Sequence, residues 1–398
     1  MATDQLKVII AGGGIGGLGT ALALQRVGVS VTVLERATEL REVGTGIGVW
    51  VNGMVALRQL GLVDEVLARG PAYHVQELRS WRGDLLVSTP VSMLARRFGV
   101  PPPIVIWRPE LIDILGKALE PGVVELRAQV VGFEQDTDGV TVHLADGREV
   151  RGDVLIGADG IHSAVRMTLS PAIGPRYAGY QYLRGITEFA TPLFPPGRFV
   201  FAFGRGDRFG MSHIGPGRLY WWAVIVAPEH APDPSEGRKA EVARRFKSFM
   251  APIPAVIQST PGDQILRNDI SDLRPLASWG VGRVTLLGDA AHATTPNLGR
   301  GAGEALEDAV TLASCLATVR RGNRAAVATV LRYYEASRMA PTARVQTTAW
   351  RLGVAASQRN PLICRARELL MRKVVGKIMV KQFEREFAEA PSLSGATR

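Results

Sequence analysis

The chain has 398 residues, of which 46% are apolar and 21% charged, and its net charge is +10. This composition is typical of a globular protein of two or so domains and excludes a disordered or fibrous chain. No apolar run is long enough to span a bilayer, and the polar N-terminus lacks a signal-peptide pattern. Cys315 and Cys364 alone provide neither a disulfide framework nor a metal knuckle, so we expect a reducing, cytoplasmic location.

The positive charge comes mostly from dispersed arginines. It indicates either a solvated basic surface or attraction of anions, such as dinucleotide phosphates or an acidic substrate. No nucleic-acid-reading motif accompanies it, so we expect no nucleic-acid partner. No group of histidines, cysteines and carboxylates has the spacing of a metal site, so we expect no metal. The pattern indicates no particular oligomeric state.

The first elements form a βαβ unit, with buried strands at Lys7–Ile10 and Val29–Leu34 and a helix between them. The turn before the helix reads Gly-Gly-Gly-Ile-Gly-Gly from Gly12 to Gly17. In a dinucleotide fingerprint, Gly12 allows the tight turn, Gly14 lets the backbone approach a pyrophosphate, and Gly17 lets helix and strand pack closely. Glu35 ends the second strand, where it is placed to accept hydrogen bonds from ribose hydroxyls.

Further along, helices are predicted over 52–60, 63–68 and 109–119, and short strands over 123–150. Residues 179–226 are rich in aromatic residues and alternate, which predicts an antiparallel sheet. Dinucleotide-domain patterns resume at Arg283, so we interpret this sheet as a domain inserted into the dinucleotide-binding domain. Helical periodicity dominates from 303 to about 386. The sequence therefore predicts an α/β fold with a Rossmann-like dinucleotide-binding domain (1–75, 100–178 and 275–340). The inserted antiparallel substrate domain covers 76–99 and 179–274, and a C-terminal helical region covers 341–398.

Two later segments repeat the strand–turn–helix pattern. "DVLIGADGIHSAVR" (Asp153–Arg166) and "RVTLLGDAAHATTPNLGRGAGEALED" (Arg283–Asp308) place Asp159 and Asp289 just past the ends of buried strands. Open α/β sheets bind ligands at these ends. A dehydrogenase needs no second Gly-Asp loop so far from the first, whereas a flavin must be held at both ends. This contrast favours FAD over NAD as the dinucleotide, in support of the resemblance described below.

The glycine turn at Gly12–Gly17 and these two segments, taken in chain order, resemble the motifs of the class A flavoprotein monooxygenases, which have the para-hydroxybenzoate hydroxylase fold. Further matches are "GTGIGVWVNGMVALRQLGL" (Gly44–Leu62) and "WRPEL" (Trp107–Leu111), and the resemblance runs from about Val8 to Trp350. It implies FAD reduction by transiently bound NADH or NADPH, and hydroxylation of an aromatic or similar electron-rich small molecule through a flavin hydroperoxide. It also implies that Asp159 and Arg166 serve NAD(P)H. The FAD-binding residues that it implies are Gly12, Gly14, Ile15, Gly17, Glu35, Arg36, Arg108, Val131, Asp159, Asp289, Pro296, Gly299, Gly301 and Ala302.

The substrate pocket is expected between the flavin loop and the inserted sheet. Alternation puts Met211 and His213 on one face of their strand. A neutral His213 there would accept a phenolic proton as the catalytic base, and the competing interpretation is a core or surface histidine. For His162 and His292 a structural hydrogen-bonding role is favoured. The other substrate candidates are Arg184, Phe203, Tyr220 and Trp222 of the inserted sheet, with Pro296 and Asn297 from the flavin loop. For each aromatic residue plain sheet core is the favoured interpretation.

One residue departs from the family pattern. Where many relatives read Gly-Gln-Gly, this chain has Gly299-Arg300-Gly301. Arg300 can point into solvent or add positive charge near the flavin or an acidic substrate. Two other functions stay open at this point: a flavin-dependent dehydrogenase or reductase on the same scaffold, and a non-catalytic or NAD-binding protein that retains only the fold.

Overall fold

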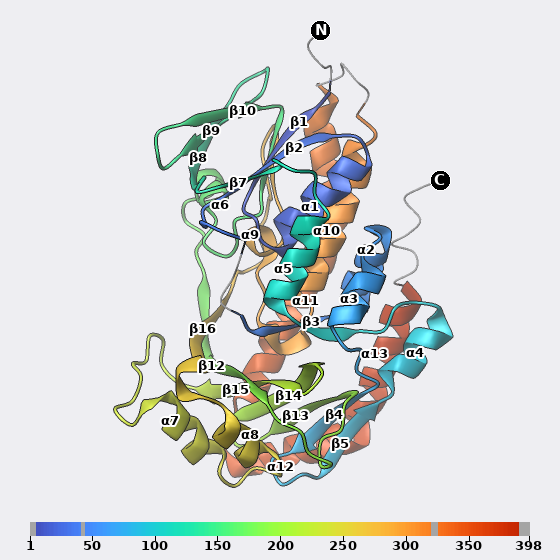
Figure 1. Ribbon diagram of the computed structural model, residues 1–398, viewed down its shortest axis with the longest axis vertical. Coiled ribbons are helices and arrows are strands. Elements are labelled where there is room, and N and C mark those ends of the chain that lie inside the picture. The colour runs from blue at the N-terminus through green and yellow to red at the C-terminus, as the bar shows by residue number, and fades with distance from the viewer. Residues whose placement is uncertain (1–4, 41–43, 320–324, 390–398) are drawn as a thin grey trace.

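The computed structural model describes residues 5–40, 44–319 and 325–389 (Figure 1). A five-stranded parallel sheet lies in the upper half of the figure. Its strands, in spatial order, are β17 (Val284–Leu286), β11 (Val154–Gly157), β1 (Lys7–Ala11), β2 (Ser30–Glu35) and β7 (Val124–Leu126). The central strands are almost wholly buried, as expected of a parallel sheet that is covered on both faces. The predicted Rossmann-like α/β architecture is thereby confirmed.

Helices and small sheets surround this parallel sheet. α1 (Ile15–Arg26), α10 (Gly301–Leu316) and α2 (Val51–Gln59) pack together beside it. α3 (Val63–Arg69) and α5 (Arg108–Lys117) match the helices predicted over 63–68 and 109–119 to within two residues. Pro109 lies in the first turn of α5. The smaller sheets are β3 (Gly46–Val49) with β6 (Ile104–Trp107), and β8 (Val130–Gln135), β9 (Val140–Leu144) and β10 (Glu149–Gly152).

A seven-stranded sheet occupies the lower half of Figure 1. Its neighbours pair antiparallel except for β13 and β4, which run parallel. α7 (Gly237–Phe246) and α8 (Ile253–Ser259) cover one face, and α4 (Val91–Phe98) follows its edge strand. The spatial order is β16 (Leu266–Asp272), β12 (Arg176–Glu188), β15 (Arg218–Val226), β14 (Arg208–Gly215), β13 (Arg198–Phe203), β4 (Val75–Ser80) and β5 (Leu85–Thr89).

The described residues from Gly301 to Glu389 are helical apart from short connections, as predicted for 303 to about 386. α11 (Ala326–Ala356) descends from the parallel sheet toward the seven-stranded one, where α12 (Pro361–Leu370), the π-helical turn η3 (Met371–Val375) and α13 (Gly376–Glu389) follow (Figure 1). α13 contacts α2, α4 and β5. Residues 390–398 of the predicted C-terminal region lie outside the described residues. In the described part of the chain, no helix is long and apolar enough to cross a membrane.

Short helical turns complete the chain. α6 (Ala164–Leu169) begins three residues later than the expected start near Ile161, because the Ser163 side chain caps it by accepting a hydrogen bond from the Arg166 N–H. The others are α9 (Asp289–His292), η1 (Gly262–Gln264) and η2 (Pro296–Leu298).

Candidate active site

The three glycine- and aspartate-bearing motifs meet at one edge of the parallel sheet. Strands β1, β11 and β17 are neighbours, and Ala11, Gly157 and Leu286 are in register at their carboxyl ends. The residues that follow, from Gly12, Ala158 and Leu287 onward, therefore emerge side by side. Segments that are distant in sequence thus form one ligand-binding edge, as the strand-end positions of the motifs predicted.

The first glycine turn has the shape of a phosphate cradle. Gly12 has a φ of +104°, and a Cβ atom there would lie 2.5 Å from the Ala158 carbonyl oxygen. A Cβ atom on Gly17 would lie 1.9 Å from the Gly12 carbonyl oxygen, so α1 packs on β1 only because this residue is glycine. A Cβ atom on Gly14, by contrast, would meet no atom within 4 Å. Gly14 therefore faces the open space that a pyrophosphate requires.

Glu35 lies beside this turn. Its carboxylate accepts hydrogen bonds from the Gly13 N–H at 2.5 Å and the Ala37 N–H at 2.8 Å. The acid is thus held at the end of β2, next to the glycine turn. Arg36 and Val131 are exposed.

Asp159 and Arg166 are tied into their own motif. Asp159 accepts hydrogen bonds from the backbone N–H groups of Ala164 and Val165, so it caps α6, and burial raises its pKa. The guanidinium of Arg166 is 1% exposed and donates to the carbonyl oxygens of Ile161 and Ala290. Arg166 therefore ties this motif to α9, and its side chain does not face the cavity described below.

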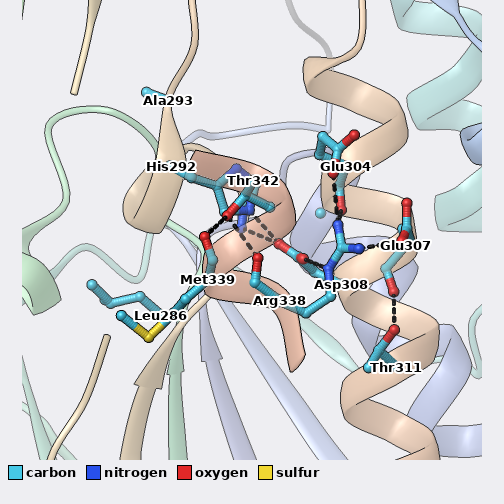
Figure 2. A network of polar contacts seen from close by, with 12 residues as sticks. Leu286, His292, Ala293, Glu304, Glu307, Asp308, Thr311, Arg338, Met339 and Thr342 are labelled. Carbon is cyan, nitrogen blue, oxygen red and sulfur yellow. Dashed lines mark hydrogen bonds and ion pairs between the residues drawn. The ribbon is translucent and has the colours of Figure 1, made fainter. Parts of the chain in front are cut away.

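The turn that carries Asp289 rests on a buried ionic network (Figure 2). Asp308 of α10 accepts a hydrogen bond from the Gly288 N–H at 3.0 Å and contacts His292 Nε2 at 2.5 Å. Arg338 of α11 pairs with Asp308 at 2.6 Å, with Glu304 at 2.8 Å and with Glu307. The structural role expected of His292 matches this position. The network fixes the backbone from which Asp289, itself exposed, points outward.

The charges of this network depend on one another. Burial alone would raise the pKa of Asp308, but His292 and Arg338 hold it below its ordinary value. Burial raises the pKa of Glu307, and Arg338 opposes that rise. Burial alone would lower the pKa of Arg338. The three carboxylates outweigh this effect, so the pKa is raised overall. Arg338 thus favours the ionised forms of Asp308 and Glu307.

The Arg300 side chain is mostly buried and ion-paired rather than directed into solvent, and Arg300 also lines the cavity described below. It pairs with Glu304 at 2.7 Å and with Glu386 of α13 at 3.2 Å. Glu386 also accepts a hydrogen bond from the Trp50 indole at 2.7 Å. The residue that departs from the family pattern therefore joins the flavin loop to the C-terminal helix.

A cavity of about 1290 Å³ runs from the glycine turn to the seven-stranded sheet. It exceeds the roughly 300–1,000 Å³ of a typical small-molecule pocket, so it has room for a large cofactor and a substrate. Among the residues that line it are many of the predicted ones, namely Gly14, Ile15, Arg108, Arg184, Phe203, Tyr220, Trp222, Asp289, Pro296, Asn297, Gly299, Gly301 and Ala302.

His213 and Met211 do not reach this cavity. Met211 packs in the core beneath α7 and α8, on the opposite face of β14. His213 stacks on Phe194, with ring centroids 5.1 Å apart, and lines a separate cavity of about 680 Å³. Burial lowers its pKa. Met211 and His213 do lie on one face of β14, as predicted, but that face does not line the large cavity. The structure therefore gives His213 no position from which to act as the catalytic base.

Sequence reasoning missed Arg208 at the start of β14. It lines the cavity, is 1% exposed and donates to Asn297 Oδ1 at 3.0 Å. Its guanidinium carbon lies 5.0 Å from the centroid of the Tyr180 ring. An arginine at the start of a strand that also carries Phe209, Met211 and Ile214 was the available signal. Also missed were Tyr182, Phe201, Arg367, Met371, Met379 and Phe383, which line the same cavity.

Comparison with known proteins supplies the decisive observation, because residues 5–349 match the FAD binding domain family. The chain belongs to this family. Aurachin C monooxygenase/isomerase of Stigmatella aurantiaca is 41% identical over 367 residues, or 92% of this chain and 94% of the relative. The FAD-dependent urate hydroxylase of Klebsiella pneumoniae is 33% identical over 338 residues, or 84% of this chain and 86% of the relative. The crystal structure of Klebsiella pneumoniae HpxO with FAD and uric acid has a TM-score of 0.89 at 30% identity, covering 97% of this chain and 98% of that one.

The chain is an FAD-dependent monooxygenase that uses NAD(P)H as electron donor and acts on a small molecule. The predicted cofactor and reaction class are confirmed, and the relatives support hydroxylation over the dehydrogenase or reductase alternative. The glycine cradle and the size of the cavity both fit FAD. When bound, FAD supplies the redox chemistry between NAD(P)H and dioxygen. The residues of the chain bind, orient and shield the reactants.

Proposed function

We propose that this monooxygenase acts in the cytoplasm and hydroxylates a planar aromatic molecule that is anionic or readily ionised. The observation that carries this proposal is the buried guanidinium of Arg208 in the cavity wall. A buried cation is stable only when it is paired or well hydrogen-bonded. An anionic substrate would supply the partner.

The partners of Arg208 within the protein are neutral. Its two terminal nitrogens donate to Asn297 Oδ1 and, at 3.4 Å, to Ser357 Oγ, while the buried Nε has no hydrogen-bond partner. Arg367 lies nearby and donates to the carbonyl oxygens of Ala356 and Gly204. Among the described residues neither arginine forms an ion pair. This end of the cavity therefore has a net positive potential that favours an anion.

The sheet that carries Arg208 also offers flat aromatic surface to the cavity, because Gly210, two residues along the same strand, pairs with Phe201 and Trp222 of the neighbouring strands. Trp222 stacks with Tyr220 at 5.2 Å and with Phe201 at 6.0 Å between centroids, and all three line the cavity. Stacking on such rings favours a planar aromatic substrate. The same apolar wall excludes water from the reaction. The structure of a relative with uric acid is compatible with a planar, acidic substrate.

For FAD, we place the pyrophosphate at the N-terminus of α1, against Gly14 and Ile15, where free N–H groups favour negative charge. Asp289, Arg108 and the 296–302 loop would hold the flavin end. The remaining predicted positions lie outside the cavity. Gly12 and Gly17 shape the turn, while Glu35, Arg36 and Val131 are proposed for the adenosine end. Asp159 and Arg166 are proposed as positioning residues, through the turn between β11 and α6, for NAD(P)H use.

The proposal is tested with matched substrates and matched variants. Substrate-stimulated NAD(P)H oxidation is measured with hydroxylated heteroaromatics and with their O-methyl ethers, which keep the ring but cannot ionise. We expect Arg208→Met to retain FAD and to raise KM for the ionisable compounds by about 10–100-fold, because a hydrogen bond to a charged group contributes about 1.5–3 kcal/mol. Arg205→Met, an exposed arginine three residues away, serves as control. Equal KM values for the two flavin-loaded variants would reject the anionic-substrate assignment.

A further inference from the structure

Exposed apolar side chains gather in one part of the C-terminal region. Of the seventeen large hydrophobic residues that are exposed in the described chain, eight lie between residues 352 and 378. Single exposed apolar residues are common on protein surfaces, whereas a cluster marks an interaction site. The eight are Leu352, Val354, Leu362, Ile363, Leu369, Leu370, Val374 and Ile378.

The helical segment from α12 to α13 is amphipathic in an unusual way, with apolar residues on two faces. One stripe at four-residue spacing turns inward and lines or adjoins the cavity: Met371, Val375, Met379, Phe383 and Phe387. A second stripe, Leu370, Val374 and Ile378, is 43–58% exposed. The inner stripe explains the helix as a cavity wall, but that role requires neither Val374, which is exposed and does not line the cavity, nor the large exposed fractions of Leu370 and Ile378.

Basic residues flank the outer apolar stripe. Lys373, Lys377 and Lys381 are exposed and also recur at four-residue spacing. Of the acidic residues between α12 and α13, Glu384 pairs with Arg97 and Glu386 with Arg300, while Glu368 lies within the segment and offsets one of its basic charges. The outer surface of the segment therefore combines aliphatic residues with net positive charge.

This surface is continuous with the mouth of the cavity. Leu370 and Ile378 are 53% and 58% exposed, yet both line the cavity, and so does Leu352 of α11, which is 45% exposed. The apolar lining of the cavity thus extends to the outer surface between α11 and α13. A ligand entering here crosses aliphatic side chains from the surface inward.

We propose that residues 352–381 form a docking surface for an anionic lipid bilayer, which places the mouth of the cavity against the membrane. Aliphatic residues flanked by lysines are the pattern of an interfacial helix, which lies in the headgroup region without spanning the bilayer. The anionic cytoplasmic leaflet attracts clustered lysines. A symmetric contact with a second copy of the chain is disfavoured, because it would bring the lysine rows of the two copies together. The proposal is independent of the identity of the substrate.

The test uses the flavin-loaded full chain and vesicles of phosphatidylcholine, with or without phosphatidylserine, in co-sedimentation. We expect binding to the anionic vesicles, weakening with salt, and little binding to the neutral ones. The triple variant K373Q/K377Q/K381Q should bind about 10²-fold more weakly, at about fivefold per lysine. The control K117Q/K239Q/K247Q removes the same charge from outside the segment and should bind within about twofold of the wild type.

The apolar contribution is tested with L369Q/V374Q, whose two positions are exposed and do not line the cavity. We expect a tenfold or larger loss of vesicle binding with unchanged flavin content. Sedimentation velocity of the wild type in solution is measured in parallel. Equal weakening by the two lysine triples would overturn the proposal, as would absence of binding to anionic vesicles. A dimer that L369Q/V374Q dissociates would overturn it in favour of a second copy.

Discussion

Replacement of Arg338 by methionine tests whether the buried network supports the flavin loop. The side chain of Arg338 is 5% exposed and is shared by Glu304, Glu307 and Asp308 (Figure 2). Methionine fills much of the same volume but leaves the three acids without their common cation. Removing one partner of a buried ion pair costs about 3–5 kcal/mol, because the remaining charge is buried and uncompensated. We expect a loss of this size in the free energy of unfolding at neutral pH.

The corresponding change in melting temperature follows from the size of the chain. Unfolding entropy of about 2.1 cal/mol/K per residue gives about 0.8 kcal/mol/K for 398 residues. A loss of about 4 kcal/mol therefore lowers the midpoint by roughly 5 °C. Thermal unfolding followed by circular dichroism measures this. Arg344→Met, an exposed arginine on the same helix, is the control and should change the midpoint by about 1 °C or less.

The defect should depend on pH with a definite sign. In the wild type the lowered pKa of Asp308 contributes stability above the ordinary aspartate pKa, and this stability is lost as pH falls toward the folded-state value. Without Arg338 the folded-state pKa values of the acids rise above their unfolded values, so the variant loses stability as pH increases from about 5 to about 8. His292 and Arg300 remain as the facing cations and limit the effect. If the melting midpoints of wild type and variant differ by the same amount at pH of about 5 and about 8, or do not differ at either pH, the reasoning is refuted.

Three further predictions concern the flavin site and the C-terminal helix. Gly12→Ala should lower both stability and flavin content, because Gly12 has a positive φ and lies close to the Ala158 carbonyl. Gly14→Ala should lower flavin content alone. Melting curves and flavin absorbance, measured in parallel, distinguish the two effects. Asp289→Ala should leave a folded protein that loses FAD on gel filtration, and a fully yellow variant would contradict the assignment. Glu386→Gln should speed tryptic cleavage in α13 severalfold, because it weakens the ion pair with Arg300. Glu384→Gln, whose partner Arg97 is exposed, should change the cleavage rate little. Equal cleavage rates for the two variants would show that Glu386 does not hold the helix.

The ligand-binding edge was predictable because its signals are local. Gly12, Asp159 and Asp289 each follow a buried strand, and parallel strands must present their carboxyl ends at one edge. Tyr220 and Trp222 of the aromatic-rich β15 were named as substrate candidates, and both line the cavity. The order of three such motifs also specified FAD, which the family match confirms.

The face of β14 was not predictable in the same way. All eight of its residues are buried, since one side packs on α7 and α8 while the other side meets the cavity region. Polarity therefore does not distinguish the two faces, and His213 was assigned to the wrong one. Arg208 was missed because its neutral partners, Asn297 and Ser357, come from distant elements. Such contacts depend on tertiary packing, which local sequence patterns do not encode.

The anchors of α13 bear on how the cavity opens. Trp50 packs against Phe383 and Phe387 at 4.6 and 5.6 Å between centroids, and Glu386 pairs with Arg300, all in the second half of the helix. The other end begins at the π-helical turn η3, where Leu370 and Ile378 are exposed at the mouth of the cavity. The backbone of η3 is held as well, since Met371 packs against β4 and β5 and Arg372 pairs with Asp84 at 3.3 Å. Movement at the mouth is therefore expected in the exposed side chains of Leu370 and Ile378. A substrate can then enter past Leu370 and Ile378 while the Arg300–Glu386 pair, and with it the flavin loop, stays in place.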